Sequence, residues 1–126
     1  MTRQISFFFT AAVLGTGCLT GNSYPDHYAS AYCDALFTCV PEGQIDGLLG
    51  FDSVEECYAE KAEDIRNSSS FDSYQEGDHV FRKEKAESCI AEVDQMLTDD
   101  SCDGNMDILS FTLDAVESDC SEVYDD

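Results

Sequence analysis

The oxygen-bearing side chains of the stretch DDSCDGNMDILS, residues 99–110, have the spacing that best suits metal chemistry. Calcium loops of the EF-hand type place oxygen ligands at alternating positions around a glycine turn and end on a glutamate that supplies two oxygens. The candidate ligands here are Asp99, Ser101, Asp103, Asn105 and Asp107. The closing glutamate is replaced by Ser110. Two interpretations stay open: a weak calcium site, or an acidic turn with Gly104 in a left-handed conformation and Asp107 at the positive end of a helix.

Residues for catalysis are sparse. The two histidines, His27 and His79, lie outside any motif for nucleophilic or metal-assisted hydrolysis. The carboxylates are too numerous to single out an acid–base pair. Four aromatic side chains fall near loops or helix starts, where they can close the ends of a bundle and favour a core over a ligand site: Phe51, Phe71, Phe81 and Phe111. We therefore expect no enzymatic activity and no cofactor, calcium being the single candidate.

The chain has seven cysteines, one at position 18 and the others downstream. None forms the C-x-x-C pair that zinc ribbons and thioredoxin-like redox sites use. In an exported protein such cysteines tend to pair, and disulfides compensate for the small core of a short domain. The cysteines expected to form disulfides are Cys33, Cys39, Cys57, Cys89, Cys102 and Cys120.

Geometry limits the disulfide pairings without fixing them. If the first two helices form an antiparallel hairpin, Cys39 at the end of one meets Cys57 at the start of the next, and we prefer this pair. Cys33 then pairs with Cys89 or Cys120. A continuous last helix would be roughly 22 Å long, so the two cysteines that flank it could pair only if it were short or broken.

The first 17 residues have the order of a secretory signal. Arg3 precedes an apolar run at 5–14, which is too short to span a bilayer, and small residues follow. With Cys18 directly after them, the segment resembles a bacterial lipoprotein signal, whose cysteine is acylated and becomes the mature N-terminus. That pattern has Leu three positions before the cysteine, where this chain has Gly15. The alternative is an ordinary signal cut near Gly17, which leaves a free or intermolecular thiol.

The chain is strongly acidic. Six basic and 27 acidic residues give a formal net charge of −21. Removal of residues 1–17, which hold one basic residue and no acid, leaves 5 − 27 = −22. Such a charge opposes binding to nucleic acid and to anionic lipid. It suits a solvated surface, a high-salt habitat, cation binding or a basic protein partner.

Helical periodicity accounts for most of the chain after the signal. Pro25 and Asp26 suit the first turn of a helix over about 24–40. Ser53 and Glu56 form a capping box that opens a second helix. No segment is typical of a strand. The other expected elements are a glycine-rich loop over 41–52, a break over 66–78, a third helix over about 79–97 and a last helical stripe over 109–123.

These elements predict an all-α fold, a small disulfide-stapled bundle of about four helices after an N-terminal signal segment. The expected divisions are a signal peptide at 1–17, a lipidated tether at 18–26 and a cysteine-rich helical domain at 27–126.

The downstream cysteines and their flanking motifs resemble those of small cysteine-rich lipoproteins predicted in myxobacteria and related bacteria. The matching features are Cys33 and Cys39 at the end of the first helix, FDSVEEC ending at Cys57, AESC ending at Cys89, then Cys102 and Cys120. Members of this group mostly have no assigned activity, so the resemblance implies a location rather than a mechanism.

We expect a lipid-anchored protein of the cell envelope, a non-catalytic structural or binding module. Leu19 rather than Asp follows Cys18, which in diderm bacteria resembles lipoproteins sent to the outer membrane, where the domain faces the periplasm or the exterior. The expected partners are the membrane, through the lipid, and a basic protein, with no nucleic acid. The alternatives are an acidic calcium-binding module that uses the 99–110 loop and an unanchored secreted effector or inhibitor.

Overall fold

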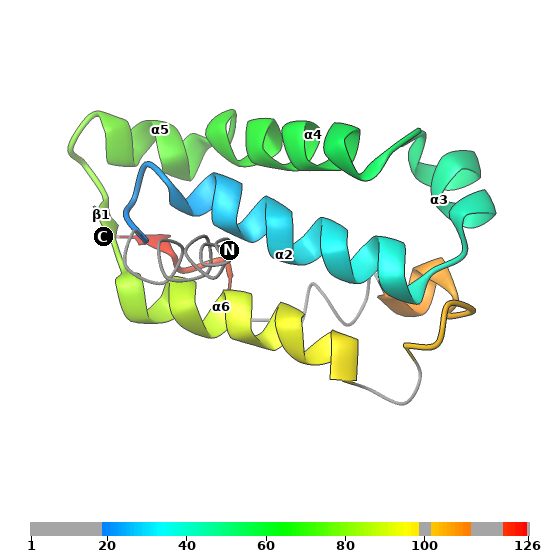
Figure 1. Ribbon diagram of the computed structural model, residues 1–126. Helices are drawn as coiled ribbons and strands as arrows, with labels where there is room; N and C mark the ends of the chain where they lie inside the picture. Colours follow the sequence, from blue (N-terminus) through cyan, green and yellow to red (C-terminus); the bar gives the residue numbers. More distant parts are fainter. Residues whose placement is uncertain (1–18, 99–101, 112–119, 126) are drawn as a thin grey trace, which may run out of the picture.

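The structure is a computed structural model that describes residues 19–98, 102–111 and 120–125. Within these ranges the chain is mostly helical and carries one small two-stranded sheet (Figure 1). Its elements are α2 (Tyr24–Cys39), α3 (Glu42–Leu49), α4 (Val54–Arg66), α5 (Ser69–Gln75), β1 (Val80–Phe81), α6 (Lys83–Gln95), the 3₁₀ helix η2 (Met96–Thr98) and β2 (Tyr124–Asp125). The predicted disulfide-stapled helical bundle is confirmed.

Helix α2 is the centre of the bundle, and α4 and α6 pack along its two sides (Figure 1). The helix α4 runs antiparallel to α2 and is continued by α5, whereas α6 runs parallel to α2 (Figure 1). Because it is covered on both sides, α2 buries residues around much of its circumference, with Cys33, Ala35 and Leu36 fully inaccessible to solvent. The predicted first helix is confirmed almost to the residue.

The bundle has two different ends (Figure 1). At the entry end, residues 19–23 lead into α2 and lie beside α5, the β1–β2 pair and the start of α6. At the α3 end, α2 finishes and α3, the start of α4 and residues 102–111 come together.

The predicted capping box opens α4. Ser53 Oγ accepts a hydrogen bond from the backbone N–H of Glu56 at 3.2 Å. In return Glu56 Oε1 accepts from the backbone N–H of Asp52 at 2.6 Å, one residue earlier than the usual partner. The reciprocal pair satisfies backbone donors that the first turn of a helix leaves open.

The prediction of a loop over 41–52 is wrong, because α3 occupies most of it. Pro41 precedes the helix in an extended conformation, and Gly50 ends it with a left-handed φ of 77°. Ile45 in the middle is fully buried. Burial of one large apolar side chain outweighs the low helix propensity of the glycines around it.

Two further boundaries differ from the prediction. The expected break over 66–78 contains α5, whose N-cap Ser68 accepts from the backbone N–H of Phe71. The third helix begins at Lys83 rather than His79, because residues 80–81 pair antiparallel with 124–125 instead. The expectation of no strand was therefore wrong for this pair.

The last predicted helical stripe is only partly tested. Residues 108–111 are helical, and Val123 lies in a bend before β2 rather than on a helix. The span 112–119 lies outside the described residues.

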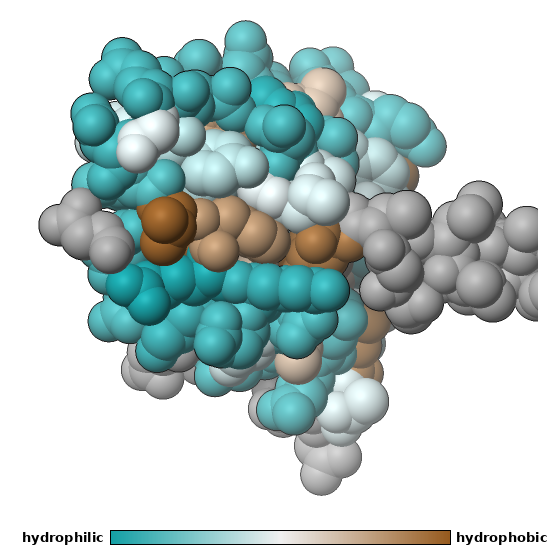
Figure 2. All heavy atoms as spheres, turned by 90° about the vertical axis from the view of Figure 1, so that its left-hand side faces the viewer, coloured by the Kyte–Doolittle hydropathy of each residue, from teal (hydrophilic) through white to brown (hydrophobic). Residues whose placement is uncertain are grey.

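Two hydrophobic clusters fill the bundle. The α2–α4 cluster lies along α2 and toward the α3 end, and includes Leu36, Ile45, Phe51, Val93 and Phe111. The aromatic cluster lies at the entry end and comprises Tyr24, Phe71, Ala86, Cys89, Val123 and Tyr124, with Leu19, Tyr28, Tyr74 and Phe81 packed against it. Figure 2 shows the surface of the entry end, where an apolar strip runs between hydrophilic surfaces. The four phenylalanines predicted to close the bundle belong to these two clusters.

Candidate functional site

All six cysteines predicted to form disulfides do so. The pairs are Cys33–Cys57, Cys39–Cys102 and Cys89–Cys120, with Cα atoms 5.9, 4.3 and 5.0 Å apart. The first joins α2 to α4, the second ties residue 102 to the end of α2, and the third ties residue 120 to α6. Each disulfide therefore joins a segment that is distant in sequence to α2, at the centre of the bundle, or to α6, at its side.

The preferred pairing of Cys39 with Cys57 is wrong, and the partner of Cys33 is neither Cys89 nor Cys120. Helix α3 is the physical reason, because it separates the end of α2 from the start of α4. Cys57 therefore meets α2 nearly two turns before its end, at Cys33.

Cys39 faces residues 102–106 instead of α4. Its carbonyl oxygen accepts a hydrogen bond from the backbone N–H of Met106 at 2.9 Å, next to the disulfide with Cys102. Gln44 Oε1 of α3 accepts from the backbone N–H of Ile108 at 3.1 Å. These contacts hold the C-terminal part of the candidate calcium loop against α2 and α3.

The two carboxylates of that loop that the structure describes accept hydrogen bonds from the loop's own backbone. Asp103 Oδ1 accepts from the N–H of Asn105 at 3.0 Å. Asp107 Oδ2 accepts from the N–H groups of Leu109 and Ser110 at 3.0 and 3.3 Å, and so caps the helical residues 108–111.

The described part of the loop, residues 102–110, has the geometry of the acidic turn that was one of the two interpretations. Gly104 has a left-handed φ of 84°. The other candidate ligands, Asp99 and Ser101, lie outside the described residues, as does the candidate anchor Cys18. Across the part of the chain that the structure describes, no group of three or more His, Cys, Asp or Glu side chains is placed to hold a metal ion.

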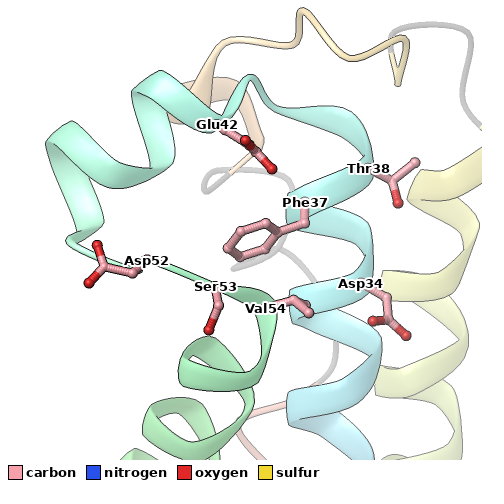
Figure 3. Close-up of a pocket in the computed structure, with 7 residues that line it drawn as sticks. All are labelled: Asp34, Phe37, Thr38, Glu42, Asp52, Ser53 and Val54. Carbon is pink, nitrogen blue, oxygen red and sulfur yellow. The ribbon is translucent and has the colours of Figure 1, made fainter.

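A hollow of about 530 Å³ opens at the α3 end (Figure 3). It lies where the end of α2, the start of α3 and the start of α4 meet. Its lining residues are Asp34, Phe37, Thr38, Glu42, Asp52, Ser53 and Val54. The ring of Phe37 points into the space between α3 and α4 (Figure 3). No local sequence pattern indicates this hollow, because it forms only where α2, α3 and the start of α4 meet.

The hollow is acidic, with three carboxylates and no basic residue in its lining. Tyr58 donates its hydroxyl hydrogen to Asp34, and this hydrogen bond is the main cause that raises the pKa of Tyr58 to about 12. Ser53 is engaged as the helix cap. The arrangement suits a cationic group with an apolar portion, since carboxylates surround an aromatic ring.

The histidines do not approach the hollow. His27 lies in the first turn of α2 and His79 lies between α5 and β1, both at the entry end. Asp34 is about two helical turns beyond His27 along α2. The described structure thus brings neither histidine to the carboxylates that line the hollow.

Comparison with known proteins finds no matching family, no matching curated protein and no matching solved structure. Among the helices that the structure describes, none combines the length and apolar character needed to cross a membrane.

Proposed function

We propose that this protein is a lipid-anchored component of a bacterial cell envelope that acts as a non-catalytic structural or binding module. The observation that carries the proposal is the disulfide set. The chain has seven cysteines, and the six in the helical domain pair with one another. Cys18 is the remaining one, directly after a signal-like segment, and acylation gives it a role.

The α3 end is the candidate binding surface of this module. The hollow there has an acidic and aromatic lining. A basic protein is the partner class that this charge favours, and its association would weaken as salt is added. The proposed location is the outer membrane, with the domain facing the periplasm or the exterior.

Intact mass measurement of the chain from a bacterial membrane fraction, before and after reduction and alkylation, tests the anchor. We expect a mature chain that begins at Cys18, carries added acyl mass, and gains six alkylation sites only on reduction. The Cys18→Ser variant should be lost from the membrane fraction, and its six other cysteines should stay paired. Thr16→Ser, which alters the signal but keeps the cysteine, is the matched control and should stay in the membrane. A non-acylated chain in the medium with a seventh reactive thiol would overturn the proposal in favour of a secreted effector or inhibitor.

A further inference from the structure

The chain enters the bundle through a turn that is part of the fold. This entry turn comprises residues 19–23. The backbone N–H of Thr20 donates to Ser23 Oγ at 2.9 Å, and the N–H of Ser23 donates back to Thr20 Oγ1 at 3.1 Å. The N–H of Tyr24 donates to the carbonyl oxygen of Thr20 at 2.9 Å, which joins the turn to α2.

Side chains from three other elements fix the entry turn in place. Tyr124 donates its hydroxyl hydrogen to the carbonyl oxygen of Gly21 at 2.7 Å. The side chain of Gln75 donates to Asn22 Oδ1 at 2.7 Å. Arg66 binds the Asn22 carbonyl oxygen at 3.4 Å and forms an ion pair with Asp26 at 3.0 Å.

The chain between Cys18 and the packed domain is very short. Leu19 is half-buried and packs against the aromatic cluster. One peptide unit, about 3.8 Å between Cα atoms, therefore separates the proposed acylation site from the packed domain. The part of the predicted tether that the structure describes, residues 19–26, is folded onto the domain.

The surface around the entry turn is apolar at its centre (Figure 2). Val80 on β1 is 56% exposed, although its neighbour Phe81 packs against the aromatic cluster. Exposed Val80 and half-buried Leu19 and Phe81 all lie at this end, so it presents apolar surface near the point where the chain enters.

The basic residues lie toward the same end. All five that follow Cys18 fall within 61–66 and 82–85, in the second half of α4 and at the start of α6. The described residues of the α3 end, 37–56 and 102–111, contain seven acids and no Lys or Arg. The α3 end is thus the part of this acidic protein that a phosphate-bearing surface would repel most strongly.

We propose that the entry end rests directly against the lipid headgroups of the membrane that holds Cys18, and that the α3 end points away from it. This inference depends on the proposed anchor, which supplies the affinity, while the entry turn supplies the orientation. The 16 residues of α2 span about 24 Å. The acidic hollow therefore lies beyond a headgroup layer about 5–7 Å deep, where a protein partner can contact it.

Tryptophan fluorescence can test this orientation, since the natural chain contains no Trp. The full acylated chain would carry Val80→Trp at the entry end or Leu48→Trp on α3, where Leu48 is 67% exposed. Each variant would be reconstituted into phosphatidylcholine vesicles with and without brominated acyl chains. We expect bromine to quench Val80→Trp several-fold more strongly than Leu48→Trp.

A tether insertion provides the matched control. Ten Gly/Ser residues placed between Cys18 and Leu19 have an end-to-end distance of about 17 Å and leave both the acyl chain and the domain intact. Quenching of Val80→Trp should fall toward that of Leu48→Trp in this variant. An acylated chain with equal quenching at both positions would overturn the orientation and leave the anchor standing. A chain without acyl mass would overturn the anchor and the orientation together.

Discussion

Both ends carry a disulfide, but at the entry end aromatic rings pack around Cys89–Cys120, whereas at the α3 end backbone hydrogen bonds accompany the Cys39–Cys102 link. At the entry end, Tyr124 packs edge-on against Tyr24 and Phe71 with ring centroids 5.8 and 5.3 Å apart. At the α3 end, the Cys39–Cys102 disulfide and the hydrogen bond between Met106 and Cys39 attach residues 102–111.

Because of this difference, we expect the stability of the two ends to respond to different degrees to pH and to reduction. Burial of tyrosine rings stabilises the entry end only while the rings stay uncharged, so that end is sensitive to pH. A disulfide stabilises by restricting the unfolded chain, and the restriction grows with the length of the closed loop. Reduction should therefore weaken both ends, and more so the α3 end, because Cys39–Cys102 spans a sequence separation of 63 residues and Cys89–Cys120 one of 31. The proposed anchor therefore attaches to the end whose aromatic packing responds to pH, and the candidate binding surface lies at the end whose disulfide closes the longer loop.

The largest effect should come from removing the disulfide at the α3 end. The double substitution Cys39→Ala and Cys102→Ala opens a link across a sequence separation of 63 residues. The expected loss of unfolding free energy is about 4 kcal/mol, from loop entropy, measured by urea denaturation. Hydrogen exchange should quicken at Met106 and Ile108 while the near-ultraviolet dichroism of the aromatic cluster is retained. Loss of both signals together would show that the two ends are one cooperative unit.

Alkaline pH should destabilise the aromatic packing of the entry end. Burial, aided by neighbouring tyrosines, raises the pKa of Tyr24 and Tyr124 above the usual 10, and that of Tyr28 to about 12. The unfolded chain releases these protons at lower pH than the folded chain does. The stability that these buried tyrosines contribute is therefore fully present below pH 10 and is lost as pH rises from 10 through about 12, where Tyr28 ionises in the folded chain.

Tyrosinate absorbance and urea denaturation at increasing pH would check this expectation. Tyr28→Phe removes one of the delayed ionisations and should flatten the pH dependence of the unfolding free energy. If all tyrosines of the native protein ionised together near their ordinary pKa, the contrast between the two ends would lose its electrostatic basis.

A smaller effect is expected from a methyl group at the entry turn. A Cβ on residue 21 would lie 2.1 Å from the hydroxyl oxygen and 2.2 Å from Cζ of Tyr74. That ring packs against Tyr124 and Phe71, so its movement disturbs the cluster. Gly21→Ala should lower the unfolding free energy by about 1–3 kcal/mol in urea denaturation.

Gly47→Ala is the matched control at the α3 end. It lies inside α3 with nothing within 4 Å of the added carbon. Better helix propensity should raise stability by roughly 0.5–1 kcal/mol. Opposite signs for the two substitutions would support a packed entry turn, and equal small gains would indicate a loose one.

The smallest effect concerns Asp107. As a helix cap it contributes about 1 kcal/mol, so Asp107→Ala should lower the melting temperature by a few degrees to the same extent with and without millimolar calcium. Calorimetric scans in calcium and in magnesium would separate a cap from a ligand. A rise in melting temperature with calcium alone, lost in Asp107→Ala, would restore the calcium-binding alternative.

The sequence by itself determined the local elements whose signals lie close together in the chain. Pro25 and Asp26 marked the start of α2, and Ser53 and Glu56 marked the start of α4. Caps and helical periodicity act over a few residues, so they can be read without knowledge of distant contacts. The cysteine composition likewise indicated that the helical domain is held by disulfides.

Only the tertiary structure decided features that depend on distant segments. Helix α3 exists because Ile45 is buried against the bundle, and its presence redirects Cys57 to Cys33 and Cys39 to Cys102. The pairing of β1 with β2 joins residues too far apart for any local pattern to indicate. The hollow and the packed entry turn have the same origin, because each is made where several elements meet. Burial and long-range contact thus outweigh local propensity at these positions.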